Sequence, residues 1–218
     1  MKGAILGCWL LVVVVGAQTN APVGQSATAG DGRYADRAGA LEQAGANFAG
    51  IFSNLCQMVL AESTRVPHRR VDDEVRAMFG GLWHWARRGG KLTLQGQQDK
   101  AFHFIGGGAF QGYFDAGRAA AVIKEELDRR DPGNRFDLDD MAATMLGARW
   151  VDLATSDDQA QNRRWVELWA TGQRTLEKSL PELKFGRLQK GQEPAPEEIK
   201  SVQEAVTAAL PSMSRPMP

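Results

Sequence analysis

Apolar residues recur at intervals of three and four along most of this chain. That spacing places them on one face of an α-helix, whereas a half-buried strand needs strict alternation of apolar and polar residues. No segment of the sequence has convincing strand alternation. With 218 residues, the chain is long enough to bury a core. The sequence therefore predicts an all-α fold, a compact bundle of about six helices with a flexible N-terminal leader and a C-terminal tail.

Prolines, glycines and capping residues set the expected ends of these helices. A residue before proline avoids the helical region, so Val66-Pro67 ends the first helix. Asp137 is a suitable N-cap for the helix that begins there. Pro181 ends a later helix, which is expected to stop at Leu180. We expect helices over residues 34–62, 70–88, 98–114, 116–130, 137–154 and 158–180, with a short last helix over 196–210.

The N-terminus resembles a secretory signal. Lys2 supplies a positive start, Ala4 to Val15 supply an apolar core, and Ala17 lies at a suitable cleavage point. An uncleaved membrane anchor is the alternative, but the apolar stretch is shorter than the about 20 residues that a span requires. We therefore expect residues 1–17 to be a signal peptide, and the protein to be exported to the periplasm or secreted.

The rest of the chain divides by composition. Residues 18–32 are rich in small and polar residues and are expected to form a flexible leader. Residues 33–190 are expected to form the helical domain, with a motif core over 98–154. Residues 191–218 are expected to contain a linker, the short last helix and a disordered tail. The sequence leaves open whether that last helix packs on the body of the protein.

Cysteine, tryptophan and charge content limit the partners. Cleavage would leave Cys56 as the one cysteine, among apolar neighbours, so we expect a buried inert thiol rather than an exposed thiol that links two copies. Lys plus Arg and Asp plus Glu are 26 each, so no basic field favours a nucleic-acid partner. The oligomeric state stays open. We expect the tryptophans after the signal to be core anchors rather than the lining of a groove for sugar or lipid: Trp83, Trp85, Trp150, Trp165 and Trp169.

A histidine and a run of glycines lie close together in the helix over 98–114. Asp99 and His103 are four residues apart, on one helical face, where the acid can orient the imidazole. Gly106, Gly107 and Gly108 follow at once. Each glycine in a helix costs about 1 kcal/mol relative to alanine, so the run indicates a neighbour that comes very close. Tight helix packing without any chemistry is an equally suitable explanation for the glycines alone.

Further charged residues follow in the next two expected helices. Taken singly, each has a structural explanation, as an exposed ion pair or as an acid at a helix start. Their combination with the histidine predicts a polar site. The candidate catalytic or ligand-binding residues are His103, Glu125, Asp128 and Asp140, with Asp99 and Lys124 in support.

Two kinds of chemistry suit this set of residues. One histidine with two or three carboxylates binds a divalent cation, so a divalent metal is the cofactor to test. Alternatively, His103 acts as a general base that a carboxylate orients. The sequence has no HExxH, GxSxG, P-loop or paired CxxC motif that would decide between them. His68 and His84 are expected to be surface or packing residues.

The order and spacing of these residues resemble a known family. The matching positions are Asp99-Lys100, His103-Phe104, Lys124-Glu125, Asp128, Phe136, Asp140, Ala143 and Gly147. This pattern is similar to the YfiM-like family of small predicted periplasmic proteins and lipoproteins, which shares motifs with VanZ-like proteins. The match spans only residues 99–150. It implies a helical envelope module with a polar centre and a partner in the cell envelope or at its membrane, with no named substrate.

Two functions follow as expectations. The first is an exported helical envelope protein in which the polar residues have a structural or binding role. The alternative is a metal- or His-dependent hydrolase that acts on a component of the cell envelope.

Overall fold

The computed structural model describes residues 29–65, 68–131, 133–179 and 184–212 of the chain, and in these residues all the regular secondary structure is helical. The all-α prediction is therefore confirmed. The predicted signal peptide and most of the predicted leader lie outside the described residues. The helices are α2 (Ala29–Gln43), α3 (Phe48–Arg65), α4 (Val71–Arg87), α5 (Gln98–Phe114), α6 (Gly117–Arg130), α7 (Leu138–Ala154), α8 (Gln159–Ala170), α9 (Leu176–Ser179) and α10 (Pro196–Ala209).

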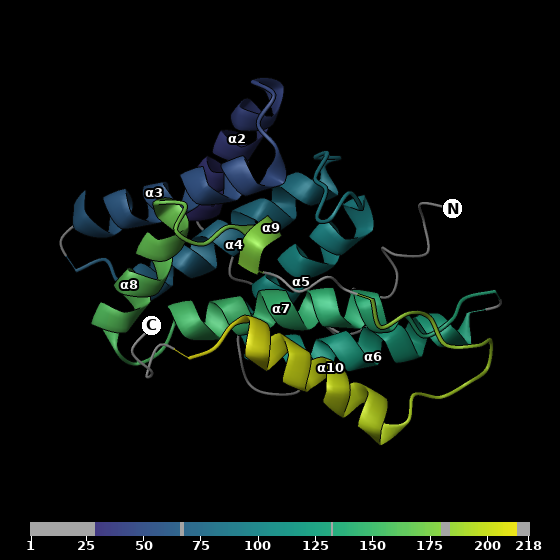
Figure 1. The fold of residues 1–218 in the computed structure, drawn as a ribbon. Helices are drawn as coiled ribbons and strands as arrows, with labels where there is room; N and C mark the ends of the chain where they lie inside the picture. Colours follow the sequence, from purple (N-terminus) through teal and green to yellow (C-terminus); the bar gives the residue numbers. More distant parts are fainter. Residues whose placement is uncertain (1–28, 66–67, 132, 180–183, 213–218) are drawn as a thin grey trace.

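The helices form two packed groups. Figure 1 shows α2, α3 and α4 in the upper part of the bundle, with α8 beside α3, while α6, α7 and α10 lie in the lower part. Helices α5 and α7 have the most extensive contact, and α5 also packs on α4 and so joins the two groups. Helix α10 packs along α7 and buries Val202 and Val206. The C-terminal helix is thus part of the body of the protein.

Glycines allow the α5 and α7 backbones to touch. A Cβ atom added to Gly107 would lie 1.9 Å from the carbonyl oxygen of Thr144, and one added to Gly147 would lie 1.8 Å from that of Phe104. No side chain fits at either distance, so both positions require glycine for the two helices to approach this closely. The neighbour that the glycine run predicted is therefore α7.

Aromatic rings fill the core where the two groups of helices meet. The Phe52 ring packs edge-on against Trp150 at 5.1 Å and against Phe104 at 5.7 Å between ring centroids. Trp165 and Trp169 are also buried and pack on each other at 5.8 Å. Such edge-to-face pairs add to the hydrophobic stabilisation of the core. The prediction of core tryptophans is confirmed for these residues and for Trp85, while Trp83 is partly buried.

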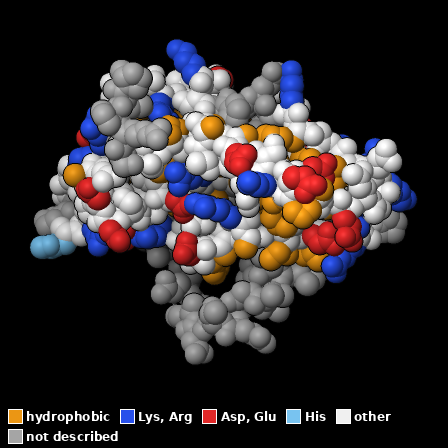
Figure 2. All heavy atoms as spheres, turned by 60° about the horizontal axis from the view of Figure 1, so that its bottom comes forward, with side chains coloured by type: hydrophobic (Ala, Val, Ile, Leu, Met, Phe, Trp, Pro, Cys, Tyr) orange, Lys and Arg blue, Asp and Glu red, His pale blue; other side chains and the backbone are white. Residues whose placement is uncertain are grey.

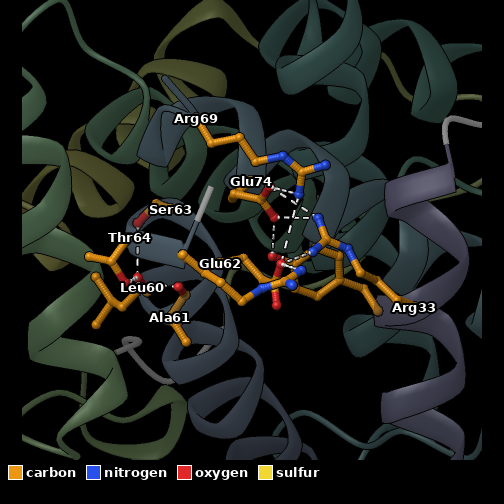
Figure 3. Close-up of polar contacts among 10 residues, drawn as sticks. Arg33, Leu60, Ala61, Glu62, Ser63, Thr64, Arg69 and Glu74 are labelled. Atoms are coloured by element: carbon orange, nitrogen blue, oxygen red, sulfur yellow. Dashed lines mark hydrogen bonds and ion pairs between the residues drawn. The ribbon is translucent and has the colours of Figure 1, made fainter. Parts of the chain in front are cut away.

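A partly buried ionic cluster holds α2, α3 and α4 together (Figure 3). Glu74 of α4 accepts hydrogen bonds from Arg33 of α2 at 2.7 Å, from Arg69 at 2.7 Å and from the Tyr34 hydroxyl at 2.6 Å. Glu62 of α3 pairs with the other nitrogen of the same Arg33 guanidinium. Because Glu74 is buried, these charge-assisted bonds fix the positions of three helices relative to one another.

Three of the predicted boundaries are wrong. The helix expected over 34–62 is broken between α2 and α3, where Gly45 has a φ of +85° that only glycine adopts readily. The helix expected over 158–180 ends at Ala170, and the Arg174 amide caps it by donating to the Leu168 carbonyl at 2.8 Å. Helix α2 begins at Ala29, so residues 29–32, expected in the flexible leader, are helical.

The surface carries mixed charges. On the face shown in Figure 2, which brings forward the lower side of Figure 1, acidic and basic side chains are interspersed around an apolar patch. This mixture agrees with the formal net charge of zero. Within the described part of the chain, no helix combines the length and the apolar character needed to cross a membrane.

Candidate functional site

The candidate residues meet where the N-terminal ends of two helices lie side by side. Contacts pair His103 with Asp140, Gly107 with Thr144 and Gly108 with Gly147, so residue numbers rise together along α5 and α7. The two helices therefore run in the same direction, and both N-termini lie at the same end. The positive ends of both helix dipoles stabilise carboxylates there. Helix α6 connects the two helices and brings its last turns back to this end.

His103 lies at the centre of this arrangement, and its side chain is only 2% exposed. Its Nδ1 atom is 3.2 Å from Oγ1 of Thr144. The Thr144 hydroxyl donates its own hydrogen to the carbonyl oxygen of Asp140 at 3.0 Å. Because a hydroxyl has a single hydrogen, Thr144 accepts from Nδ1, which carries the proton. In the neutral imidazole the lone pair is then on Nε2.

The Nε2 atom of His103 faces three charged side chains. The Lys124 ammonium is 3.2 Å away, Asp140 Oδ2 is 3.4 Å away and Asp99 Oδ1 is 3.5 Å away. The side chains of Asp140 and Lys124 are largely buried, whereas that of Asp99 is 49% exposed. The site therefore reaches solvent at Asp99.

Lys124 links the imidazole to the acids of α6. Its ammonium donates to Glu125 Oε1 at 2.7 Å and pairs with Asp128 Oδ2 at 2.8 Å. Burial lowers the pKa of Lys124, but Glu125 and Asp128 more than reverse this and hold the pKa above its ordinary value. The second oxygen of Glu125 accepts from the Asp137 amide at 3.2 Å, which ties α6 to the start of α7.

The acids of the site differ in their affinity for protons. Burial raises the pKa of Asp140 to about 7, opposed by His103 and reinforced by Asp99. Burial also raises the pKa of Glu125 to about 7 in spite of the neighbouring Lys124. The neighbouring His103 holds the pKa of Asp99 below its ordinary value. Protons are therefore held most tightly in the interior and released at the exposed edge.

The chain after α9 closes one side of the site. Asp137 caps α7 by accepting from the Asp139 and Asp140 amides, as predicted, and it also pairs with Arg187. Asp139 accepts from the amides of Phe185 at 2.6 Å and of Gly186 at 3.0 Å. These contacts fix the segment 185–187 against the first turn of α7.

All six candidate residues are joined by direct contacts, through His103 and Lys124. The His103 cluster, as we call it, consists of Asp99, His103, Lys124, Glu125, Asp128, Asp140 and Thr144. Within it, one ligand atom each of Asp99, His103 and Asp140 lies within 4.8 Å of the other two. Glu125 and Asp128 hold Lys124 and are not part of that smaller group.

Other residues are placed as follows. His68 and His84 are exposed and lie outside the cluster. Cys56 is fully buried, and burial raises the pKa of its thiol, as expected for an inert cysteine. A surface cavity of about 390 Å³ lies between α2 and the end of α4, with Gly39 and Trp85 in its lining and no residue of the His103 cluster.

Sequence reasoning missed Thr144 and the burial of Lys100. Lys100 is 4% exposed and lies 3.7 Å from Asp139, in a helix turn where lysine usually faces solvent. Thr144 lies one helical turn after Asp140, on the same face, and this spacing was the available signal.

Comparisons of the chain with protein-family models, with curated proteins and with solved structures find no match. The resemblance of residues 99–150 to the YfiM-like family therefore stays a prediction that depends on the motif alone.

Proposed function

We propose that the protein is an exported helical protein of the cell envelope that binds a ligand at the His103 cluster. One observation carries the binding role. The lone pair of His103 Nε2 faces Asp99 and Asp140 at 3.5 and 3.4 Å, and Asp99 is half exposed. Hydrogen bonds of good geometry are shorter, at about 2.7–3.2 Å. The Nε2 lone pair accepts from the Lys124 ammonium at 3.2 Å, whereas the two carboxylates, which can only accept, lie beside it next to solvent without a donor from the imidazole.

The remaining contacts of the cluster support a rigid scaffold for such a site. Lys124, Glu125 and the Asp137 amide are bonded to one another at normal distances in the interior. A network that served packing alone would be expected to pair all of its members in this way. The looser contacts at the exposed edge are the part of the cluster that suits binding.

The proposed location depends on residues 1–17. Their positive start, apolar core and small residues at the cleavage point suit an export signal. Cell fractionation and N-terminal sequencing of the mature protein test this directly. Full-length protein that stays in the cytosol with residues 1–17 intact would contradict the proposal.

The binding role is tested on the purified full chain. A thermal-shift screen of metals, sugars and envelope fragments is compared among the wild type, His103→Gln and Asp140→Asn, with circular dichroism to confirm folding. His84→Gln is the matched control, since His84 is an exposed histidine outside the cluster. We expect a ligand response that the two cluster variants lose and the control keeps. Equal responses in all four proteins would exclude the cluster as the binding site.

A hydrolase is the second candidate, because an unprotonated Nε2 near solvent is suited to act as a general base. Within the cluster, the Thr144 hydroxyl donates to a backbone carbonyl, so a water molecule is the nucleophile that this geometry offers. Hydrolysis of an envelope fragment, lost in His103→Gln and kept in His84→Gln, is the result that this candidate requires.

A further inference from the structure

We infer that Asp99, His103 and Asp140 form a binding site for a divalent transition-metal ion. The inference rests on the proposed binding role of the His103 cluster and names its ligand class. It depends on the distances between the ligand atoms, the orientation of the imidazole and the charge around it.

The distances suit a metal ion. Zinc bonds to imidazole nitrogen and carboxylate oxygen are about 2.0–2.2 Å long, and tetrahedral geometry then puts neighbouring ligand atoms about 3.4 Å apart. The Nε2 atom of His103 is 3.4 Å from Asp140 Oδ2 and 3.5 Å from Asp99 Oδ1. The three ligand atoms lie within 4.8 Å of one another, and the Asp99 side chain is half exposed.

The imidazole is already oriented for coordination. Histidine ligands of metals commonly donate their other ring N–H to a neighbouring acceptor, which fixes the tautomer and the ring. Thr144 has this role for His103, because its hydroxyl accepts from Nδ1 at 3.2 Å. The Nε2 lone pair then faces the two carboxylates and the Lys124 ammonium.

The charge around the three residues also favours a cation. Two carboxylates and one neutral imidazole compensate a charge of +2. Lys124 opposes the ion, because its ammonium is 3.2 Å from the same Nε2 atom. When the Lys124 ammonium moves away from Nε2 to admit the ion, it keeps its bonds to Glu125 at 2.7 Å and to Asp128 at 2.8 Å. Lys124 is therefore a built-in competitor of the metal.

The ligand set leaves part of the coordination shell open. Three protein ligands with a free position are typical of exchangeable or catalytic metals, whereas structural zinc is held by four. Asp99, the most exposed of the three ligands, lies where the site meets solvent. One nitrogen and two oxygen donors suit zinc, manganese or iron(II) rather than a soft ion such as copper(I).

The test is calorimetric titration of the full-length protein, stripped with chelator, with ZnCl₂ and separately with MnCl₂. We expect saturable binding of one ion per chain. His103→Gln and Asp140→Asn should abolish it, while the controls His84→Gln and Asp73→Asn should keep it. Asp73 is a matched control for Asp99, since both are exposed acids in the first turn of a helix.

Two further variants test the details of the site. Thr144→Val should weaken zinc binding about 10–100-fold, because the group that orients a ligand is removed while the ligand stays. Lys124→Met should strengthen zinc binding by roughly tenfold, because a competing positive charge is removed from within a few ångströms of the ion. Unchanged affinity in Lys124→Met would overturn the competition between the ammonium and the metal.

The outcomes separate this inference from the proposed function. Absence of saturable zinc or manganese binding, or binding that His103→Gln leaves unchanged, overturns the metal site. Should the buried variants fail to fold, Asp99→Asn at the exposed edge decides, since unchanged affinity in that folded variant also overturns it. An organic ligand that the cluster binds without metal would overturn the inference and leave the proposed function intact. A protein that binds zinc at the cluster but remains in the cytosol would support the metal site and contradict the proposed export.

Discussion

Thr144 accepts a hydrogen bond from Nδ1 of His103 at 3.2 Å, across the interface between α5 and α7. The same hydroxyl donates to the Asp140 carbonyl, one turn earlier in its own helix. A single threonine therefore determines which nitrogen of a buried imidazole carries the proton. It does so at the point where Gly107 lets the Thr144 backbone come into contact with α5.

Thr144→Val should move the His103 proton from Nδ1 to Nε2. Valine has nearly the shape of threonine but accepts no hydrogen bond, so a protonated Nδ1 would be left buried without its partner, at a cost of about 1–3 kcal/mol. Nitrogen-15 NMR of labelled histidine distinguishes the two tautomers. Thr144→Ser keeps the hydroxyl and should keep the wild-type tautomer. An unchanged histidine spectrum in the valine variant would contradict the assignment.

Gly107→Ala should destabilise the protein by about 1–3 kcal/mol or more. The added methyl group would lie 1.9 Å from the Thr144 carbonyl oxygen, which is backbone and can move only if α7 moves. Gly32→Ala is the matched control, because a Cβ at this helical position meets nothing within 4 Å. There we expect a gain of up to about 1 kcal/mol from helix propensity. Urea unfolding of both variants, followed by circular dichroism, measures the difference.

The sequence predicted the bounds of α5, α6 and α7 closely, because turn residues at 131–134 and the Asp137 N-cap mark where α6 ends and α7 begins. Asp137 was correctly assigned as the N-cap of α7, where its side chain accepts from two amides of the first turn. The break at Gly45 was missed because the apolar period continues across it, since α2 and α3 both face the core. A period records which residues are buried and does not record a change in direction of the chain.

Long-range polar contacts could not be predicted in the same way. Arg33 and Glu74 are 41 residues apart, and neither has a neighbour in sequence that indicates the pairing. The meeting of His103 with Lys124 and Asp140 could be expected only as a combination, since the direction of α7 relative to α5 depends on the close contact at Gly107 and Gly147. Periodicity alone does not distinguish parallel from antiparallel packing of two helices.

Glu74→Gln should lower the stability of the protein by about 2–3 kcal/mol, because the bonds from Arg33, Arg69 and Tyr34 lose their buried, charged acceptor. Glu167→Gln on the exposed face of α8 should change stability by less than about 0.5 kcal/mol. The Glu74 side chain is 3% exposed, so 1 M NaCl should leave most of its effect in place. An effect that salt removes would place the contact at the surface.

The raised pKa of Asp140 gives the protein a specific dependence on pH. The folded state holds this proton up to a pH of about 7, whereas an unfolded aspartate releases it near a pH of about 3.9. Between these values the folded state binds more protons than the unfolded state, so the contribution of Asp140 to stability falls as the pH rises. The contribution of Glu125 has the same sign, since its pKa is also raised to about 7.

Asp140→Asn should therefore gain stability relative to the wild type on going from pH 5 to pH 8, by about 1–3 kcal/mol, because asparagine has no proton to lose. Glu125→Gln should behave in the same direction. Urea unfolding at both pH values, with chelator present to exclude metal binding, measures the two differences. Asp73→Asn, an exposed acid outside the cluster, is measured beside them as the control. A gain for Asp140→Asn at pH 5 rather than at pH 8 would mean that the buried carboxyl is held ionised by His103 and Lys124.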